Sequence, residues 1–496
     1  MNVLLLKSPK KTRHHATMLT TAALLLGTAV ALPAQTASAP QPAQPWTKIP
    51  IPPLPAFHPA EPREVTLPNG VRLFLEEDHE LPFIQGFVRV RGGSRDVPAD
   101  KVGLVSLYGQ TWRTSGTAAH PGDKLDDQLA DMAASIETDG GEAATSLSWS
   151  SFAKDFPTVF PLVMDLLEHP AFSEAKLKLA QEQMDAGIVR RNDNASGLAQ
   201  QQAVSLVYGP QSIYGRQPEL ATVSAVNVAD LDAWHEKTLV GTNLIVGLVG
   251  DFDARQMEAT LREAFASLPR GTKLETKEPE FVEPKPGVYF ANKSDIDQST
   301  VFVVGLGTRR DNPDYFALSV MNTIFSGGFG SRVVQNVRTK LGLAYNVGGG
   351  IGTAYDHPGM FAVEAGTKSV STVPATKAVL DELASLRTVP PTPEEMKAAK
   401  DQLLNSFIFR YDSPDKVLGE QVTLAVYGYP ADFLARYRAG IEKVTAADVQ
   451  RVAEKYVHPE KLAIVVVGNN AEIEPPLTTL GPVTPLDITI PGAPKQ

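Results

Sequence analysis

The chain has 496 residues, of which 43% are apolar and 21% are charged. That length allows two or three domains of ordinary size, each with its own buried core. The absence of cysteine excludes disulfides, thiolate catalysis and cysteine-bound metal. The formal net charge is -10, and the sequence shows no basic patch of the kind that binds nucleic acid.

Residues 1–39 have the pattern of a secretory signal peptide. An apolar run of about 15 residues over 18–32 is too short for a comfortable membrane span. Small residues follow it, with Ala37-Ser38-Ala39 as the cleavage motif, and four cations precede it: Lys7, Lys10, Lys11 and Arg13. We therefore expect an exported protein, periplasmic or secreted, with no stable membrane span once the leader is removed. An uncleaved anchor is the alternative.

Shifts in composition divide the rest of the chain into two blocks of similar size. Proline-rich segments are typical of extended tethers, and a stretch rich in Lys, Glu and Pro is typical of a linker. We predict a proline-rich tether over 40–62, a first half over 63–270, a linker over 271–286, a second half over 287–470 and a proline-rich tail over 471–496.

The predicted elements of the first half begin with strands. The runs on either side of Asn69-Gly70 predict a hairpin over 65–75, since Asn-Gly is a strong turn signal. A third strand is predicted over 83–90, followed by helices over 123–136, 174–191 and 229–238. In the second half, strands are predicted over 287–290 and 300–306, and helices over 315–325 and 393–409.

The two halves resemble each other. Residues 226–250 align without a gap with 444–468, and in each an amphipathic helix is followed by a continuous apolar strand that ends at glycine. Residues 173–193 align with 392–412 at nearly the same offset. We therefore predict an α+β protein made by tandem duplication. Each half is expected to be a mixed or antiparallel sheet covered by helices on one face.

Three short stretches carry a resemblance to a known family. They are Thr66 to Gly70, Gly103 to Val105 and Ser115 to Thr117. The second half adds Phe325-Ser326-Gly327-Gly328-Phe329-Gly330-Ser331-Arg332 and Val337-Arg338-Thr339-Lys340-Leu341-Gly342-Leu343-Ala344-Tyr345. Together they resemble the insulinase/pitrilysin zinc peptidases, over nearly all of residues 63–470. The resemblance implies two peptidase-like halves.

The zinc motif of that family, H-x-x-E-H on a helix, is degenerate in this chain. Ser106 and Gln110 occupy the histidine positions, and Gly109 occupies the position of the catalytic glutamate. The region expected to supply a distal glutamate, 185–189, offers Ala186 and Gly187. Since no two of the seven histidines after the leader lie within five residues of each other, no other histidine pair of that kind replaces the motif.

Arg338 and Tyr345 are retained at the spacing of a functional pair. In the family, an arginine and a tyrosine so placed hold the substrate backbone and the developing oxyanion at the zinc. A guanidinium and a neutral phenol are suitable hydrogen-bond donors for both tasks. The alternative is a surface arginine and a packed tyrosine without a shared role.

The glycine-rich stretches have structural interpretations. No Gly-Lys-Ser/Thr follows Gly327, Gly328 and Gly330, so a nucleotide-binding loop is not expected. A turn before a helix is expected there instead, although a substrate-handling loop is an alternative. Residues 348–350, all glycine, are expected to form a strand bulge or turn.

The resemblance implies a non-catalytic subunit of an exported heteromeric zinc metallopeptidase. Such a subunit would be inactive alone and would hold no zinc or other cofactor of its own. A homologous zinc-bearing subunit would be its partner, and peptides would be its substrates. The first alternative is an assembly protein with this fold and no role in proteolysis. The second is an enzyme with another active site, but no Ser-His-Asp or paired-carboxylate signature stands out.

Overall fold

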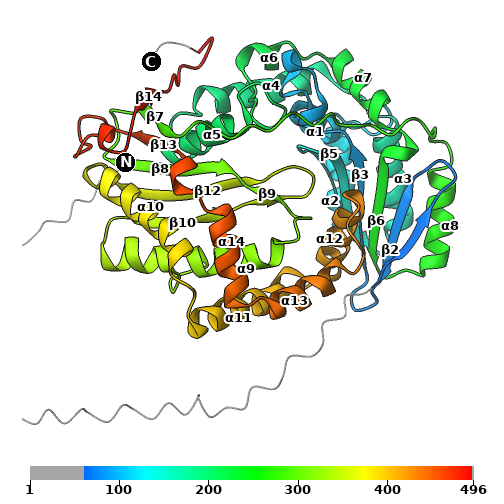
Figure 1. The fold of residues 1–496 in the computed structure, drawn as a ribbon. Coiled ribbons are helices and arrows are strands. Elements are labelled where there is room, and N and C mark those ends of the chain that lie inside the picture. The colour runs from blue at the N-terminus through cyan, green and yellow to red at the C-terminus, as the bar shows by residue number, and fades with distance from the viewer. Residues whose placement is uncertain (1–60, 494–496) are drawn as a thin grey trace, which may run out of the picture. The chain divides into compact units, whose positions relative to one another are not determined.

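A computed structural model describes residues 61–493 of the protein (Figure 1). The predicted signal peptide and nearly all of the predicted tether lie outside the described residues. Two six-stranded mixed sheets form the framework, and helices cover both. Among residues 61–493, no helix is long and apolar enough to cross a membrane. The predicted α+β class is confirmed.

The first sheet has the strand order β1-β2-β6-β3-β5-β4. Its strands are β1 (Arg63–Thr66), β2 (Arg72–Glu77), β3 (Phe83–Arg91), β4 (Ser135–Gly140), β5 (Ala144–Phe152) and β6 (Leu244–Gly250). The predicted hairpin is confirmed, because β1 and β2 pair antiparallel around Asn69 and Gly70. Gly70 has a φ of +95°, a conformation that favours glycine.

Seven helices of the first half accompany this sheet. They are α1 (Leu104–Ser115), α2 (Gly122–Asp131), α3 (Phe156–Glu168), α4 (Glu174–Val189), α6 (Leu220–Ser224), α7 (Val228–Thr238) and α8 (Ala254–Ala264). The predicted helix over 123–136 is too long, because α2 ends at Asp131 and Ile136 belongs to β4. Ala133 takes a positive φ of 48°, which ends the helical path, and buried Ile136 pairs with Trp149 of β5.

The second sheet has the strand order β10-β12-β8-β13-β7-β14. Its strands are β7 (Gly287–Asn292), β8 (Gln298–Leu306), β10 (Asn346–Ile351), β12 (Met360–Lys368), β13 (Ala463–Gly468) and β14 (Val483–Pro485). β9 (Thr308–Arg309) and β11 (Thr353–Ala354) form a separate short pair. The bulge or turn predicted at residues 348–350 is wrong, because they pair in unbroken register within β10. β14 extends the sheet from within the proline-rich tail.

Five helices of the second half lie near this sheet: α9 (Tyr315–Ser326), α10 (Thr372–Thr388), α11 (Pro393–Arg410), α13 (Phe433–Lys443) and α14 (Ala446–Tyr456). The repeat predicted from sequence appears in the structure. The pair α7 and β6 corresponds to α14 and β13, and α4 corresponds to α11. In each half, the strand after the repeated helix lies at the centre of its sheet.

Each sheet is also covered on its second face, by a helix from the other half (Figure 1). α5 (Ala195–Tyr208) packs Leu198 and Ala203 against strands of the second sheet. α12 (Pro414–Val426) packs Leu418 and Val422 against β2 and β6 of the first sheet. The expectation of helices on one face is therefore wrong. The two halves exchange one helix each, and the exchanged helices occupy corresponding positions in the repeat.

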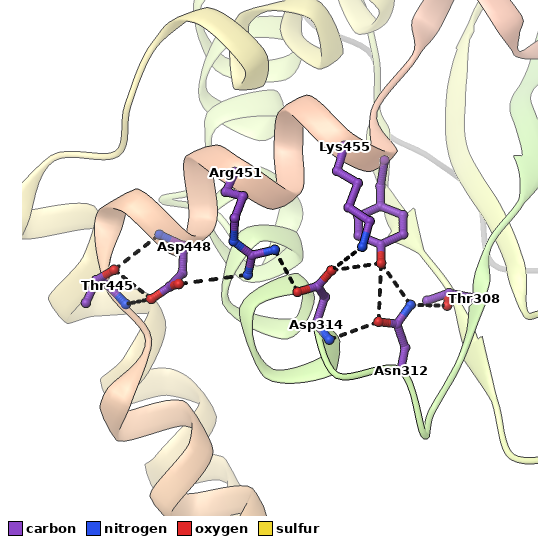
Figure 2. Close-up of polar contacts among 8 residues, drawn as sticks. Thr308, Asn312, Asp314, Thr445, Asp448, Arg451 and Lys455 are labelled. Atoms are coloured by element: carbon purple, nitrogen blue, oxygen red, sulfur yellow. Dashed lines mark hydrogen bonds and ion pairs between the residues drawn. The ribbon is translucent and has the colours of Figure 1, made fainter.

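A buried carboxylate fixes α9 to α14 within the second half. Figure 2 shows Asp314 between Arg451 and Lys455, each with a nitrogen 2.8 Å from an Asp314 oxygen. Tyr456 donates a further hydrogen bond of 2.9 Å. Although burial opposes ionisation, these donors lower the pKa of Asp314 to about 2. The second half is thus held by an ionised carboxylate at neutral pH.

Candidate functional site

Arg338 lies between two exposed aromatic rings on the second half. Its guanidinium carbon is 5.1 Å from the ring centroid of Phe329 and 5.5 Å from that of Tyr345. Both distances are in the range of cation–π contacts. Phe329 is 73% exposed and Tyr345 is 81% exposed. None of the ion pairs made by residues 61–493 includes Arg338. We call these three residues the Arg–Tyr site.

The local fold points these side chains outward. Arg338 lies on a short π-helical turn, η5 (Val334–Lys340), a form of helix that is often found at functional sites. Val337 is fully buried and anchors this turn. The backbone of Tyr345 donates a 2.8 Å hydrogen bond to the carbonyl of Gly366 as β10 begins. Packing therefore holds both ends of the segment, while the arginine and tyrosine side chains stay available to a ligand.

A cavity of about 950 Å³ opens beside Tyr345. Its walls include the first residues of α5, the start of β8 and the end of β12. Ser196 of α5 donates a 2.9 Å hydrogen bond to Glu364 of β12, so both halves shape it. The charged residues lining this tyrosine cavity are all acidic: Asp295, Asp297, Glu364 and Glu472. Such walls favour ligands that carry cationic groups.

β10, which begins directly after Tyr345, is an edge strand of the second sheet. An edge strand presents unpaired backbone groups to which an extended peptide can add as a further strand. Three consecutive glycines at 348–350 keep this strand free of bulky side chains. The Arg–Tyr site, the tyrosine cavity and this edge are therefore adjacent features of one surface.

The degenerate zinc positions lie together on α1 but do not resemble an open site. Ser106 is half-buried, Gly109 is buried and Gln110 is exposed. A Cβ atom at position 109 would lie 2.4 Å from the backbone nitrogen of Gly140 in β4. That distance is far below ordinary contact, so no side chain fits at Gly109 unless β4 moves. The position that would carry a catalytic glutamate is filled by the neighbouring strand.

The distal positions on α4 offer no better ligand. Ala186 and Gly187 are both exposed, and nothing lies within 4 Å of a Cβ placed at Gly187. The adjacent Asp185 has one buried oxygen without a hydrogen-bond partner, and burial raises the pKa of this carboxyl. A serine, a glutamine and two glycines do not fit a zinc site. No group of three or more metal-binding side chains occurs among residues 61–493.

The structure does not join the two sets of predicted residues. Arg338 and Tyr345 lie in contact, and Ser106, Gly109 and Gln110 share one helix. No hydrogen bond or ion pair within residues 61–493 links the first set to the second. Sequence reasoning missed Phe329 as the second ring beside Arg338, although it stands in the recognised stretch.

A second feature that sequence reasoning missed lies behind α1. The hydroxyl of Tyr108 is 2.8 Å from Nδ1 of buried His235 on α7. Trp112 and Phe172 pack around the same ring. Burial lowers the pKa of His235 to about 4, so the imidazole is neutral at physiological pH. This aromatic packing fixes α1 in place and gives the helix a structural role.

Comparisons with known proteins agree with this geometry. Residues 225–403 match the family model of the peptidase M16 inactive domain. An uncharacterized zinc protease of Streptomyces coelicolor is 25% identical over 423 residues, covering 79% of this chain and 86% of that protein. The non-peptidase homolog YmxG of Helicobacter pylori is 24% identical over 416 residues, covering 80% of this chain and 92% of that protein.

Solved structures show the same fold. A peptidase M16 inactive domain from Pseudomonas fluorescens has a TM-score of 0.76 at 24% identity and covers 84% of this chain and all of that one. The periplasmic protease PqqL of Escherichia coli has a TM-score of 0.70 at 14% identity, covering 83% of this chain and 46% of that one. The chain therefore has the fold of these M16 proteins, and its residues 225–403 match the inactive domain of that family. The resemblance to insulinase/pitrilysin peptidases is thereby confirmed.

Proposed function

We propose that this chain is the non-catalytic subunit of an exported, heteromeric M16-type peptidase. The observation that carries the proposal is Arg338, which is held between exposed Phe329 and Tyr345 without a carboxylate partner among the described residues. Exposed aromatic rings and a guanidinium without a carboxylate partner are well suited to binding a ligand. The neighbouring cavity and edge strand give a bound peptide room and backbone partners.

The two side chains would act on different parts of the peptide. The guanidinium of Arg338 offers several fixed donors for backbone carbonyls, with a charge that strengthens each hydrogen bond. The hydroxyl of Tyr345 offers a neutral donor for the oxygen that gains negative charge when a peptide bond is attacked. A homologous partner would supply the zinc and carry out the hydrolysis, since Ser106, Gly109 and Gln110 cannot.

The names of the relatives support both parts of this division of labour. Similar chains include proteins called zinc proteases and one called a non-peptidase homolog. A chain without ligands that keeps an open peptide surface fits the second kind. Export is supported by the leader pattern in the sequence and by a structural neighbour that is called periplasmic.

An assembly role without peptide binding is the second candidate. The exposed side chains Phe329, Leu341 and Tyr345 favour it, because a cluster of apolar residues at the surface also suits contact with another protein. In that case the contact would depend on apolar area rather than on the guanidinium of Arg338 or the hydroxyl of Tyr345. The two functions therefore predict different responses to the same substitutions.

Peptide binding by the purified mature chain separates the two. We expect a fluorescent unstructured peptide to bind, and Arg338→Ala to weaken binding about tenfold or more because charge-assisted hydrogen bonds are lost. Arg190→Ala is the matched control. Arg190 is exposed and follows the last residue of α4, in the first half of the chain. Equal affinities for the wild-type chain and Arg338→Ala would favour the assembly role.

A further inference from the structure

A second cavity, of about 340 Å³, lies between the first sheet and the exchanged helix α12. Arg72 comes from β2, and Arg89 and Arg91 from β3. Arg95 and Lys273 complete the cationic lining, and the opposite wall is the end of α12 with residues 425–428. We call it the arginine cavity. Five cations line this one cavity, whereas the whole chain has a net charge of -10.

Three of these cations have structural partners. Arg72 lies 2.7 Å from Glu64 and also donates to the carbonyl of Ala425 over 3.2 Å. Arg91 donates to the carbonyl of Val426 over 3.4 Å. Both arginines thereby cap the last carbonyls of α12, where the helix dipole favours positive charge.

Arg95 joins the two halves. It is buried, and its Nη1 lies 2.6 Å from a carboxylate oxygen of Asp356. Its Nε is also buried but has no hydrogen-bond partner among residues 61–493. An unsatisfied buried donor on a charged group is costly, so an acceptor beside this atom would be favourable.

The two remaining cations, Arg89 and Lys273, lack carboxylate partners in the described part of the chain. Arg89 donates to the hydroxyl of Thr423 over 3.0 Å, and burial lowers the pKa of its guanidinium. Lys273 is exposed and takes part in no ion pair of residues 61–493. The nearby Glu420 faces Arg310 at 3.7 Å and is engaged there. The cavity thus holds five cations against two paired carboxylates, those of Glu64 and Asp356.

We propose that the arginine cavity is a binding site for an oxyanion, namely a carboxylate or a phosphate group. Guanidinium groups present forked donors that match the oxygens of both groups, and enclosure strengthens each contact. The volume lies at the lower end of the range for small-ligand pockets. The anion would satisfy Arg89 and the free Nε of Arg95 together. It would also join the first sheet to α12, so its binding would stabilise the exchanged helix.

Isothermal titration of the mature chain with two probes tests this site. The probes are inorganic phosphate and the peptide Ala-Ala-Glu, and Ala-Ala-Gln amide serves as the reference peptide without a carboxylate. The test variant is Arg89→Gln with Arg91→Gln, in which glutamine retains a donor for Thr423 and for the carbonyl of Val426. The matched control is Arg190→Gln with Lys377→Gln, which removes two exposed cations elsewhere.

We expect saturable binding of at least one anionic probe, and at least about tenfold weaker binding to the test variant but not to the control. Binding of phosphate alone would identify a phosphate-type ligand, and binding of Ala-Ala-Glu would identify a peptide carboxylate. Should the double variant fail to fold by circular dichroism, Lys273→Ala replaces it and should also weaken binding. Absence of saturable binding, or the same affinity in test and control variants, would overturn the proposal.

Discussion

The helix α1 and the Arg–Tyr site carry the two sets of predicted site residues, and their surroundings differ. Around α1, the space for a catalytic side chain is closed, with Gly109 packed against Gly140 and Tyr108 tied to His235. At the Arg–Tyr site, Tyr345 is exposed, and Arg338 is half-buried and contacts the rings of Phe329 and Tyr345. The first half is tightly packed at the predicted zinc positions, whereas the second half presents an open surface at the Arg–Tyr site.

The largest effect should come from adding a side chain between α1 and β4. Gly109→Ala places a methyl group against the backbone of β4, so we expect a loss of about 3 kcal/mol or more in the free energy of unfolding. Gly330→Ala is the matched control, because nothing lies within 4 Å of a Cβ there. Urea unfolding measures both. Equal effects of the two substitutions would remove the packing difference between the regions.

The next effect concerns pH and the buried His235. Because its pKa falls from 6.5 to about 4 on folding, the unfolded chain takes up this proton first as the pH drops. The contribution of the neutral ring to the free energy of unfolding is therefore fully present above about pH 6.5. It decreases as the pH falls to about 4, with a total loss of up to about 3 kcal/mol. Asp314 in the second half, with a pKa of about 2 against 3.8, loses its contribution only at lower pH.

A buried glutamate in the first half opposes this loss. Burial, with nearby acidic groups, raises the pKa of Glu76 from 4.5 to about 7. The folded state therefore binds its proton first, and this contribution to stability grows as the pH falls from about 7 to 4.5. Glu76→Gln should then steepen the loss of stability between pH 6.5 and 4.5, as followed by urea unfolding. A profile that stays flat in this variant would contradict the role given to His235.

The smallest effect compares two tyrosine hydroxyls. Tyr108→Phe leaves the buried His235 without its 2.8 Å partner and should cost about 1–3 kcal/mol in unfolding free energy. Tyr345→Phe removes a hydroxyl that is in solvent, so stability should change by no more than about 0.5 kcal/mol. Thermal unfolding of both variants gives the comparison. A comparable loss in Tyr345→Phe would mean that this residue serves packing.

Much of the fold could be predicted from the sequence, because it depends on local patterns and on the repeat. The hairpin at Asn69-Gly70 and the helix–strand units that end in β6 and β13 follow directly from them. The exchange of α5 and α12 between the halves was not predicted, because it depends on contacts between distant segments. One signal was present: the uninterrupted apolar runs of β6 and β13 are typical of strands buried on both faces.

The candidate site could also be predicted in part, where its residues lie close together in the sequence. Arg338 and Tyr345 stand in one short stretch, so their proximity could be predicted from the family pattern. The close approach of Gly109 to Gly140 could not be predicted, because β4 was not expected as a strand and its first two residues were assigned to a helix. The arginine cavity gathers cations from distant points of the chain, Arg72 and Lys273 among them, and no local pattern marks them.

Peptide turnover in the assembled complex tests the central claim most directly. The mature chain, co-expressed with a homologue of the same genome that retains H-x-x-E-H, is compared with its Tyr345→Phe variant at equal complex content, confirmed by size. Loss of one oxyanion donor should lower kcat by about 10²-fold while the complex still forms. Tyr289→Phe is the control, because its hydroxyl bonds only to the carbonyl of Lys285. Undiminished turnover by an intact Tyr345→Phe complex would contradict the proposed function.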